Sequence, residues 1–392
     1  MASIQKRGNS YRIRCSTGYD SKGRQIMRST TWTPDPGMTP RQVEKELQRQ
    51  AVLFEEKCKA SGTAACTIKF EPFAREWFTE YAEKKLRIRT VARLHQLESR
   101  TYQAIGHLRM DKITARQIQS FINNLAEPGI NKRTGGGLSP KTQSHYLSFI
   151  SSVFDYAIRM DMLTDNPTKR VTIQKLEQKE KKVYTLEEAQ HFLDLMQTEP
   201  PVFQAFFVLA IYGGFRRAEI LGLEWKDIDF QTGVVTISRS SLYAKGVGTF
   251  TDTTKTKGSQ RSLKLPLFVI DILRVHRKAQ LEQRLQMGDQ WHDHDRLFTA
   301  WNGEPMGTGT PRKWLIAFCE KHGLRYLGIH SFRHLNASLL INSGVDLKTV
   351  SASLGHSQTS TTLNIYAHTF AAAQARASEA IAEVLPLHTK KA

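Results

Sequence analysis

The stretch His330–Tyr366, HSFRHLNASLLINSGVDLKTVSASLGHSQTSTTLNIY, contains a His-x-x-Arg pair, a Leu-Gly-His triplet and a final tyrosine. The pair is His330 and Arg333, which are three residues apart and therefore share one face if the segment is helical. The triplet ends at His356, and the tyrosine is Tyr366. Each residue taken singly would be a helix cap, a surface charge or a core aromatic. Their order makes the stretch informative.

These residue types suit the attack of a tyrosine on a phosphodiester. A phenol has a pKa of about 10 and is a weak nucleophile at neutral pH, so Tyr366 needs a base. The neutral imidazole of His330 can accept the phenolic proton, and His356 can donate to a phosphate oxygen. Two guanidiniums can clamp the non-bridging oxygens and stabilise a five-coordinate transition state. We predict that they are Arg333 and Arg216, in Gly214-Phe215-Arg216-Arg217-Ala218-Glu219.

The departing 5′ oxygen needs a proton donor, and a lysine on a β-hairpin fits this role. We favour Lys255, in Thr254-Lys255-Thr256-Lys257-Gly258-Ser259-Gln260-Arg261, with Lys257 as its rival. Two solvated hairpin lysines are the alternative. Glu219, beside an apolar helix, is predicted to be a buried carboxylate that orients Arg216 rather than a surface group.

In this order the positions resemble the motif set of the tyrosine recombinases. The set comprises Arg216 with Glu219, Lys255, His330-Ser331-Phe332-Arg333, Leu354-Gly355-His356 and Thr362-Leu363-Asn364-Ile365-Tyr366. The similarity is greatest to integrases of phages and integrative conjugative elements, and it covers the C-terminal half of the chain. Phe332 stands where many relatives carry Leu, which leaves every polar role filled.

The resemblance implies a site-specific DNA recombinase. Tyr366 would form a 3′-phosphotyrosyl link and free a 5′-hydroxyl, and rejoining would integrate or excise a mobile element without a metal or other cofactor. The implied partners are double-stranded recombination sites, further copies of the chain as a dimer to tetramer on DNA, and an excision factor or host DNA-bending protein. A type IB topoisomerase and a non-catalytic DNA-binding regulator are the alternatives.

Composition points to a polyanionic partner. The chain has 392 residues, a formal net charge of +19 and a pI of about 9.8. Such an excess of Lys and Arg favours nucleic acid through phosphate neutralisation and counterion release. An anionic membrane surface would also attract it, but no apolar run is long enough to span a membrane and the start lacks a signal-peptide core. We therefore expect a soluble, intracellular protein, and the resemblance to the tyrosine recombinases implies a bacterial cytoplasmic one associated with the nucleoid.

Other chemistries lack their motifs. The four cysteines, Cys15, Cys58, Cys66 and Cys319, show neither zinc-module nor disulfide spacing. The run His292-Asp293-His294-Asp295 has metal-ligand residue types, but a solvated loop is the better interpretation. The sequence contains no Walker-type loop and no dinucleotide fingerprint.

The expected fold class is α+β and mainly helical, with three domains. We predict a module of sheet plus helix over 1–66 and an all-helical domain over 67–173. The resemblance implies that the first is an arm-type DNA-binding domain and the second a SAM-like core-binding domain. A charged linker over 174–182 then precedes a mixed α/β catalytic domain over 183–392 that ends in an exchange helix. The linker would let domains close around a duplex, although an ordinary solvated linker fits as well.

The first module reads as strands followed by one helix. Ser10–Cys15 and Gln25–Thr30 alternate as strands, and Thr31–Thr33 suggests a third. A helix opens at Thr39-Pro40. The predicted DNA contacts on this sheet are Arg12, Arg14 and Arg28, with Lys22 and Arg24 nearby; a basic solubilising module is the alternative.

The second region shows four amphipathic segments, which are Pro72–Tyr81, Val91–Tyr102, Ala115–Leu125 and Ser139–Arg159. Ser139 and Pro140 are suited to the N-cap and the first turn of the last helix. We therefore predict that Lys141, Thr142 and His145, at or near that end, contact a DNA backbone. The alternative is a well-capped structural helix.

The catalytic region begins with a capping box at Thr185 and Glu188 and continues with a buried helix, Val202–Tyr212. Val234–Ser238, Gly248–Thr253 and Arg261–Pro266 suggest one small antiparallel sheet. Phe370–Leu385 reads as an amphipathic helix that packs either on its own domain or on a neighbouring copy.

Overall fold

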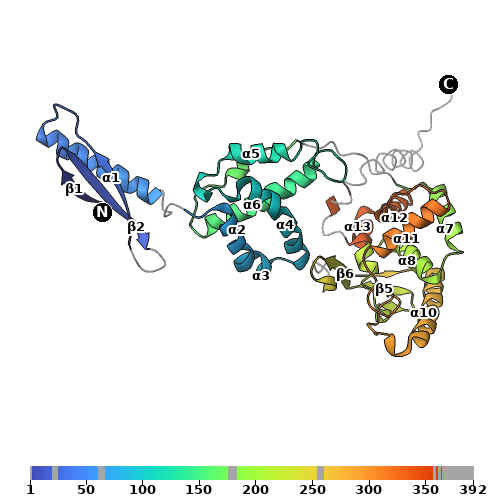
Figure 1. The fold of residues 1–392 in the computed structure, drawn as a ribbon. Helices are drawn as coiled ribbons and strands as arrows, with labels where there is room; N and C mark the ends of the chain where they lie inside the picture. Colours follow the sequence, from blue (N-terminus) through green and yellow to red (C-terminus); the bar gives the residue numbers. More distant parts are fainter. Residues whose placement is uncertain are drawn as a thin grey trace, which may run out of the picture. The chain divides into compact units, whose positions relative to one another are not determined.

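The computed structural model describes residues 2–19, 25–60, 67–174, 183–253, 260–355, 359–360 and 363. The chain divides into two compact units, Met1–Gln178 (unit 1) and Lys179–Ala392 (unit 2). Helices predominate and the sheets are small and antiparallel (Figure 1), so the predicted fold class is confirmed. No helix in the described ranges is long and apolar enough to cross a membrane.

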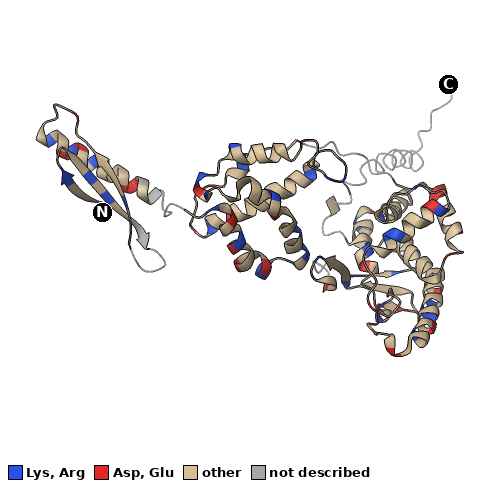
Figure 2. Cartoon of the chain, viewed as in Figure 1, with Lys and Arg blue, Asp and Glu red and all other residues tan. Residues whose placement is uncertain are grey.

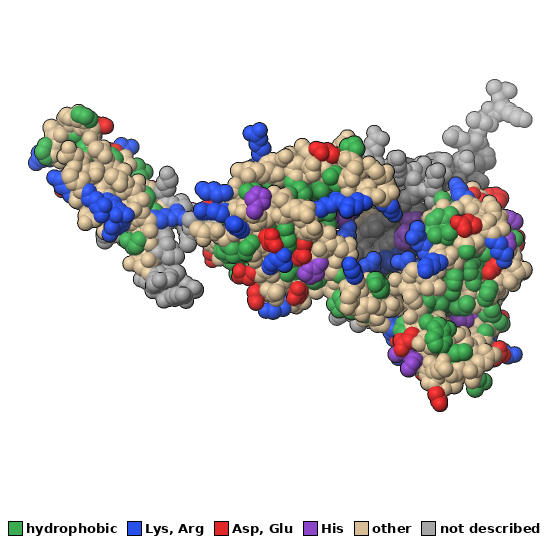
Figure 3. Space-filling view, in the orientation of Figure 1, with side chains coloured by type: hydrophobic (Ala, Val, Ile, Leu, Met, Phe, Trp, Pro, Cys, Tyr) green, Lys and Arg blue, Asp and Glu red, His purple; other side chains and the backbone are tan. Residues whose placement is uncertain are grey.

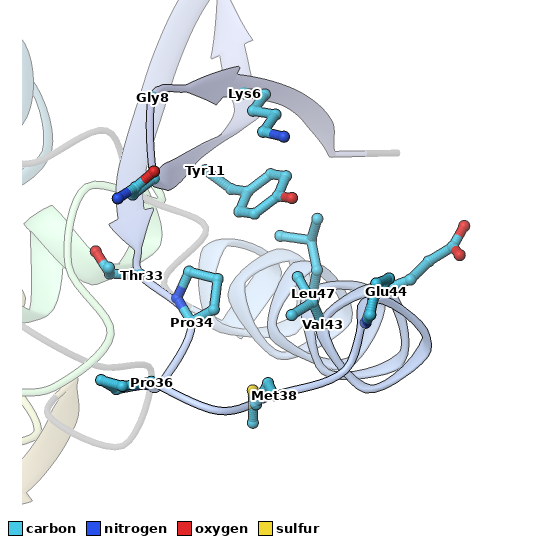
Figure 4. Close-up of a pocket in the computed structure, with 12 residues that line it drawn as sticks. Lys6, Gly8, Tyr11, Thr33, Pro34, Pro36, Met38, Val43, Glu44 and Leu47 are labelled. Atoms are coloured by element: carbon cyan, nitrogen blue, oxygen red, sulfur yellow. The ribbon is translucent and has the colours of Figure 1, made fainter.

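Unit 1 opens with a three-stranded antiparallel sheet covered by one helix. The elements are β1 (Ser3–Arg7), β2 (Ser10–Tyr19), β3 (Gln25–Trp32) and α1 (Pro40–Ala60), with sheet order β1-β2-β3. Ile13 from the sheet and Leu47 and Ala51 from α1 form the buried core. An open groove of about 850 Å³ lies where the β1–β2 turn approaches the start of α1; Tyr11, Val43 and Leu47 line its apolar side (Figure 4).

One strand assignment was wrong. Thr31 and Trp32 do not form a separate strand. They extend the predicted second strand, which is β3, because the pairing of β3 with β2 continues past Thr30. The third strand is β1, which the sequence did not reveal because all of its residues are exposed and no alternation of buried and exposed positions marks it.

Helices make up the rest of unit 1, and they confirm the four predicted segments to within a few residues. They are α2 (Phe70–Trp77), η1 (Phe78–Ala82), α3 (Glu83–Lys85), α4 (Ile88–Thr101), η2 (Tyr102–Gly106), η3 (Met110–Lys112), α5 (Ala115–Asn124), α6 (Pro140–Arg159) and η4 (Pro167–Arg170). Large aromatic side chains such as Phe70, Trp77 and Phe149 fill the core. Ser139 caps α6 by accepting from the Thr142 amide at 3.3 Å, as predicted.

Unit 2 surrounds the apolar helix α8 (Pro201–Tyr212). The other helices are α7 (Leu186–Met196), α9 (Arg217–Ile220), η5 (Trp225–Asp227), α10 (Leu267–Met287), η7 (Gly288–Gln290), α11 (Thr310–Lys321), α12 (His330–Asn342) and α13 (Leu347–Leu354). Helices α10, α11 and α12 contact α8, whose residues 205–210 are all buried. This confirms the predicted buried helix.

The strands of unit 2 form two sheets instead of the single predicted sheet. They are β4 (Ile228–Asp229), β5 (Val234–Ile237), β6 (Arg239–Ala244), β7 (Gly248–Thr253) and β8 (Arg261–Lys264). One sheet has the order β4-β5-β8, and β6 pairs with β7 in the other. The prediction missed β6, because its Arg-Ser-Ser start has no apolar alternation, and so gave β7 the wrong neighbour.

Candidate active site

Arg216 follows a tight turn at the end of α8. Gly214 in this turn has φ +56°, and a Cβ there would come within 2.6 Å of the Asn336 side-chain oxygen. Only glycine fits both the backbone conformation and this approach. Arg216 then caps the short helix α9: its amide donates to Glu219 Oε2 at 2.9 Å, and its Nη1 donates to Glu219 Oε1 at 2.7 Å.

Glu219 is a buried carboxylate shared by two arginines. Its side chain is 4% exposed, and Arg261 donates to it through Nη2 at 2.9 Å and through Nη1 at 3.3 Å. Burial by itself would raise the pKa of Glu219. The hydrogen bond and charge of Arg261, with the charge of Arg216, outweigh burial and hold the pKa below its usual value. The prediction that Glu219 is a buried partner of Arg216 is confirmed, and its lowered pKa favours the carboxylate form.

Arg333 projects from the first turn of α12 into the same region. It is 2% exposed and donates through Nη1 to the Gly214 carbonyl at 2.7 Å and through Nη2 to the Leu354 carbonyl. His330, the first residue of α12, is exposed, and the centre of its ring lies 4.7 Å from the centre of the His334 ring. The helix thus presents an accessible imidazole one turn before a buried guanidinium.

Three arginines contact three consecutive carbonyls at the end of α13. Arg261 Nε donates to Ser353 O at 2.7 Å, Arg333 to Leu354 O, and Arg216 Nη2 to Gly355 O at 3.2 Å. The last carbonyls of a helix have no partners within the helix and carry partial negative charge, so guanidiniums are well suited to them. Gly355 ends the helix with φ +62° and is followed in the sequence by His356.

The structure thus brings Arg216 and Arg333 together and leaves His330 accessible on the same helix as Arg333. The predicted residues Lys255, His356 and Tyr366, with the rival Lys257, lie outside the described residues. The same holds for the predicted C-terminal helix 370–385 and for most of the predicted linker. Arg261 was missed as a member of this cluster. Its signal was indirect: a buried Glu219 that is ionised needs more positive charge than one partly exposed Arg216 supplies.

The predicted DNA contacts of the N-terminal sheet occupy two faces. Arg12 and Arg14 alternate with the buried Ile13, and Arg14 pairs with the exposed Ser29. Arg28 instead pairs with Cys15, on the face that carries the core. The structure therefore brings Arg12 and Arg14 together, away from α1, but it does not add Arg28 to them.

The predicted contacts on α6 lie in a basic cluster. Lys141 is exposed, whereas Thr142 and His145 are half-buried. Burial, followed by the charges of Arg93 and Lys141, lowers the pKa of His145, which places Arg93 of α4 in the same cluster. Figure 2 marks the positions of Lys and Arg along the sheet module and the helical part of unit 1, and Figure 3 shows Lys and Arg side chains on the visible face of both. Within the described ranges, no group of three His, Cys, Asp or Glu could hold a metal ion.

Sequence comparison decides the family. Residues 182–373 match the phage integrase family, and residues 70–174 match the phage integrase central domain. The chain belongs to the phage integrase family of tyrosine recombinases. It is a site-specific recombinase of the phage or integrative-conjugative-element type.

Relatives of this recombinase include the ICEBs1 integrase of Bacillus subtilis, 29% identical over 70% of the chain and 72% of the relative. A tyrosine recombinase XerC-like protein of Caldanaerobacter subterraneus is 30% identical over 67% of the chain and 68% of the relative. The integrase of Staphylococcus phage L54a is 26% identical over 80% of the chain and 94% of the relative. None of these three is a topoisomerase or a non-catalytic regulator.

Solved structures share the fold of the recombinase. A Tn1549 transposon integrase in complex with a circular intermediate DNA has a TM-score of 0.64 at 21% identity, over 80% of this chain and 99% of that one. A lambda integrase dimer bound to a core site has a TM-score of 0.54 at 15% identity, over 92% and 93%.

Proposed function

We propose that this recombinase integrates and excises a mobile element by transesterification at Tyr366. The phenolic oxygen attacks a backbone phosphorus, the bond to the 5′ oxygen breaks, and a 3′-phosphotyrosyl link forms. The freed 5′-hydroxyl of a partner strand then attacks that link and releases the tyrosine. Each step exchanges one phosphoester for another, so no nucleotide cofactor is consumed.

One observation supports this proposal most directly. Arg216 and Arg333, far apart in sequence, meet at the carbonyls of Leu354 and Gly355, immediately before His356. A guanidinium can hold phosphate oxygens through two-point, charge-assisted hydrogen bonds, and this is the role that we propose for both arginines.

The further roles follow the motif order. The exposed imidazole of His330 accepts the phenolic proton, His356 donates to a non-bridging oxygen, and Lys255 protonates the 5′ oxygen, with Lys257 as the alternative donor. Glu219 orients Arg216 through the hydrogen bonds that it accepts from it.

The DNA-binding parts are proposed from charge and position. Residues 1–66 bind arm-type sites through Arg12 and Arg14, and residues 67–173 bind the core site through the cluster of Lys141, Thr142 and His145. Residues 174–182 link them to the catalytic part, 183–392. Solved relatives of this fold are bound to DNA, and a lambda integrase forms a tetramer on a Holliday junction. We infer that this chain likewise assembles as a dimer to tetramer on its sites, in the bacterial cytoplasm, with an excision factor or a DNA-bending protein.

Trapping of the covalent intermediate tests the mechanism. A duplex nicked just 3′ of the cleavage point loses its short 5′-hydroxyl fragment, so a cleaved strand stays attached to the protein. We expect the unaltered protein to give an adduct that resists denaturation, and Tyr366→Phe to give none. Adducts formed by Tyr366→Phe would overturn the nucleophile assignment.

A second assay separates recombination from DNA relaxation. Two linear duplexes that carry the attachment sites at the ends of the element should be joined into recombinant products. Relaxation of a supercoiled plasmid without joining would favour a topoisomerase-like function instead.

A further inference from the structure

We propose that Arg261 is a positioning residue for Arg216, acting through the carboxylate that the two share and through the backbone at the end of α13. Arg261 belongs to the same cluster as Arg216 and Arg333 but has no step in the phosphate chemistry proposed above. The inference rests on the proposed function, because it explains how Arg216 is held in place for the proposed cleavage reaction.

Arg261 connects three segments that are distant in sequence. It is the first residue of β8, where it pairs with Ile237 of β5, so its backbone is fixed in the sheet. Its side chain is 7% exposed, and its guanidinium carbon lies 5.4 Å from the centre of the Phe215 ring. From this position it contacts both oxygens of Glu219 and the carbonyl of Ser353.

The contacts leave Glu219 little freedom. Arg216 donates to both of its oxygens, and Arg261 also donates to both. Without Arg261 the buried carboxylate would keep Arg216 as its partner but lose half of these bonds. It would then rotate or take up a proton, and either change would release the orientation of Arg216.

The approach of Arg261 to α13 is equally close. A Cβ on Gly355 would come within 2.6 Å of Arg261 Nη1, so the guanidinium packs directly against the backbone whose carbonyl accepts from Arg216. Arg261 therefore fixes both groups that hold Arg216, namely Glu219 and the 353–355 backbone.

Replacement of the scissile phosphate tests this role. In the nicked substrate, a methylphosphonate at the cleavage point removes one negative charge, so its transition state depends less on Arg216. We expect Arg261→Gln to slow cleavage of the ordinary phosphodiester by about 10- to 100-fold, as for loss of a group that orients a functional side chain. On the methylphosphonate, Arg261→Gln should slow cleavage by about threefold or less. Equal losses on both substrates would overturn the proposal.

For each variant, the ratio of the cleavage rate on the phosphodiester to that on the methylphosphonate does not depend on which fraction of the preparation is folded. The matched control is Arg296→Gln, another buried arginine of unit 2, which donates to Gly222 O at 2.6 Å and lies near Glu224. Arg296→Gln should slow cleavage of both substrates by the same factor. Arg261→Lys, which keeps the charge beside Glu219, should restore part of the phosphodiester rate.

A pH profile gives a second measurement on the phosphodiester. Loss of Arg261 raises the pKa of Glu219, so Arg261→Gln should lose activity on acidification at a higher pH than the unaltered protein does. A uniform loss across pH would contradict the proposal. If the unaltered protein forms no Tyr366-dependent adduct, the proposed function fails; if it does and Arg261→Gln behaves as Arg296→Gln, only this inference fails.

Discussion

At the scale of single residues, the site depends on the planar shape of arginine. Arg333 donates through its two terminal nitrogens to two different carbonyls, those of Gly214 and Leu354. An ammonium group concentrates its charge at one point and cannot reproduce this fork.

We therefore expect Arg333→Lys to slow adduct formation on the nicked substrate by about 100-fold or more, the cost of losing one oriented donor to a developing charge. DNA binding, measured on the same duplex, should change little. The control is Lys313→Gln, an exposed charge on α11. A cleavage rate within a few-fold of that of the unaltered protein would show that charge is sufficient at this position.

Glu219 gives a prediction about stability and pH. Glu219→Gln should lower the free energy of unfolding by about 3–5 kcal/mol, because it leaves the buried Arg261 without its counter-charge. The folded-state pKa of Glu219 lies below its unfolded value. Its stabilising contribution is therefore complete above the unfolded pKa, about 4.3, and is lost as the pH falls through the folded value.

Urea unfolding of unit 2 across pH 3–7 checks this. The difference in free energy between the unaltered protein and Glu219→Gln should be largest near neutral pH and should shrink on acidification. A constant difference across this range would show that the lost stability has another origin.

The sequence identified Arg216 and its carboxylate partner because both belong to one ordered motif. Arg261 was not predictable in the same way. Its role arises from the pairing of β8 with β5 and from the proximity of Ser353, which local sequence does not encode.

At the scale of elements, the turn between α8 and α9 positions Arg216. Gly214→Ala would place a non-glycine residue at φ +56° and also push a Cβ against Asn336. A left-handed conformation costs an L-residue about 1–2 kcal/mol. We expect Gly214→Ala to lower the free energy of unfolding in urea by more than this amount and to slow cleavage.

Gly323→Ala is the matched control, because Gly323 has φ +66° but open space around its Cβ position. It should show the backbone cost without the collision. Equal destabilisation by the two variants would mean that Asn336 moves away without penalty.

Helices were predictable and sheet pairing was not. Periodicity and caps located α6 and α8 because those signals lie within the helix itself. Strand partners are non-local, so β1 and β6 were missed and β7 was given a wrong neighbour.

At the scale of the whole molecule, the net charge of +19 implies that DNA affinity depends strongly on salt. Each phosphate neutralised contributes about 0.9 to the slope of log affinity against log salt. We expect Arg12→Gln and Arg14→Gln each to lower that slope for arm-site DNA by about this amount.

Arg28→Gln should leave the slope unchanged, because Arg28 lies on the opposite face of the sheet. Equal effects of all three changes, measured by anisotropy titration between 50 and 200 mM salt, would argue against binding through one face.

The proposed oligomer on DNA can be tested by truncation. If the tail exchanges between copies, deletion after Phe370 should abolish multimeric complexes in gel-shift assays while leaving unit 2 folded. Unaltered assembly would refute this role for the tail, whose predicted helix lies outside the described residues.

If Arg216 and Arg333 bind the phosphate as proposed, their bonds to the Gly355 and Leu354 carbonyls link phosphate affinity to the position of that backbone. If bound phosphate disfavours either bond by some factor, breaking that bond must favour phosphate binding by the same factor. Under the proposed mechanism, phosphate binding would then be coupled to the position of the peptide unit that precedes His356 in the sequence.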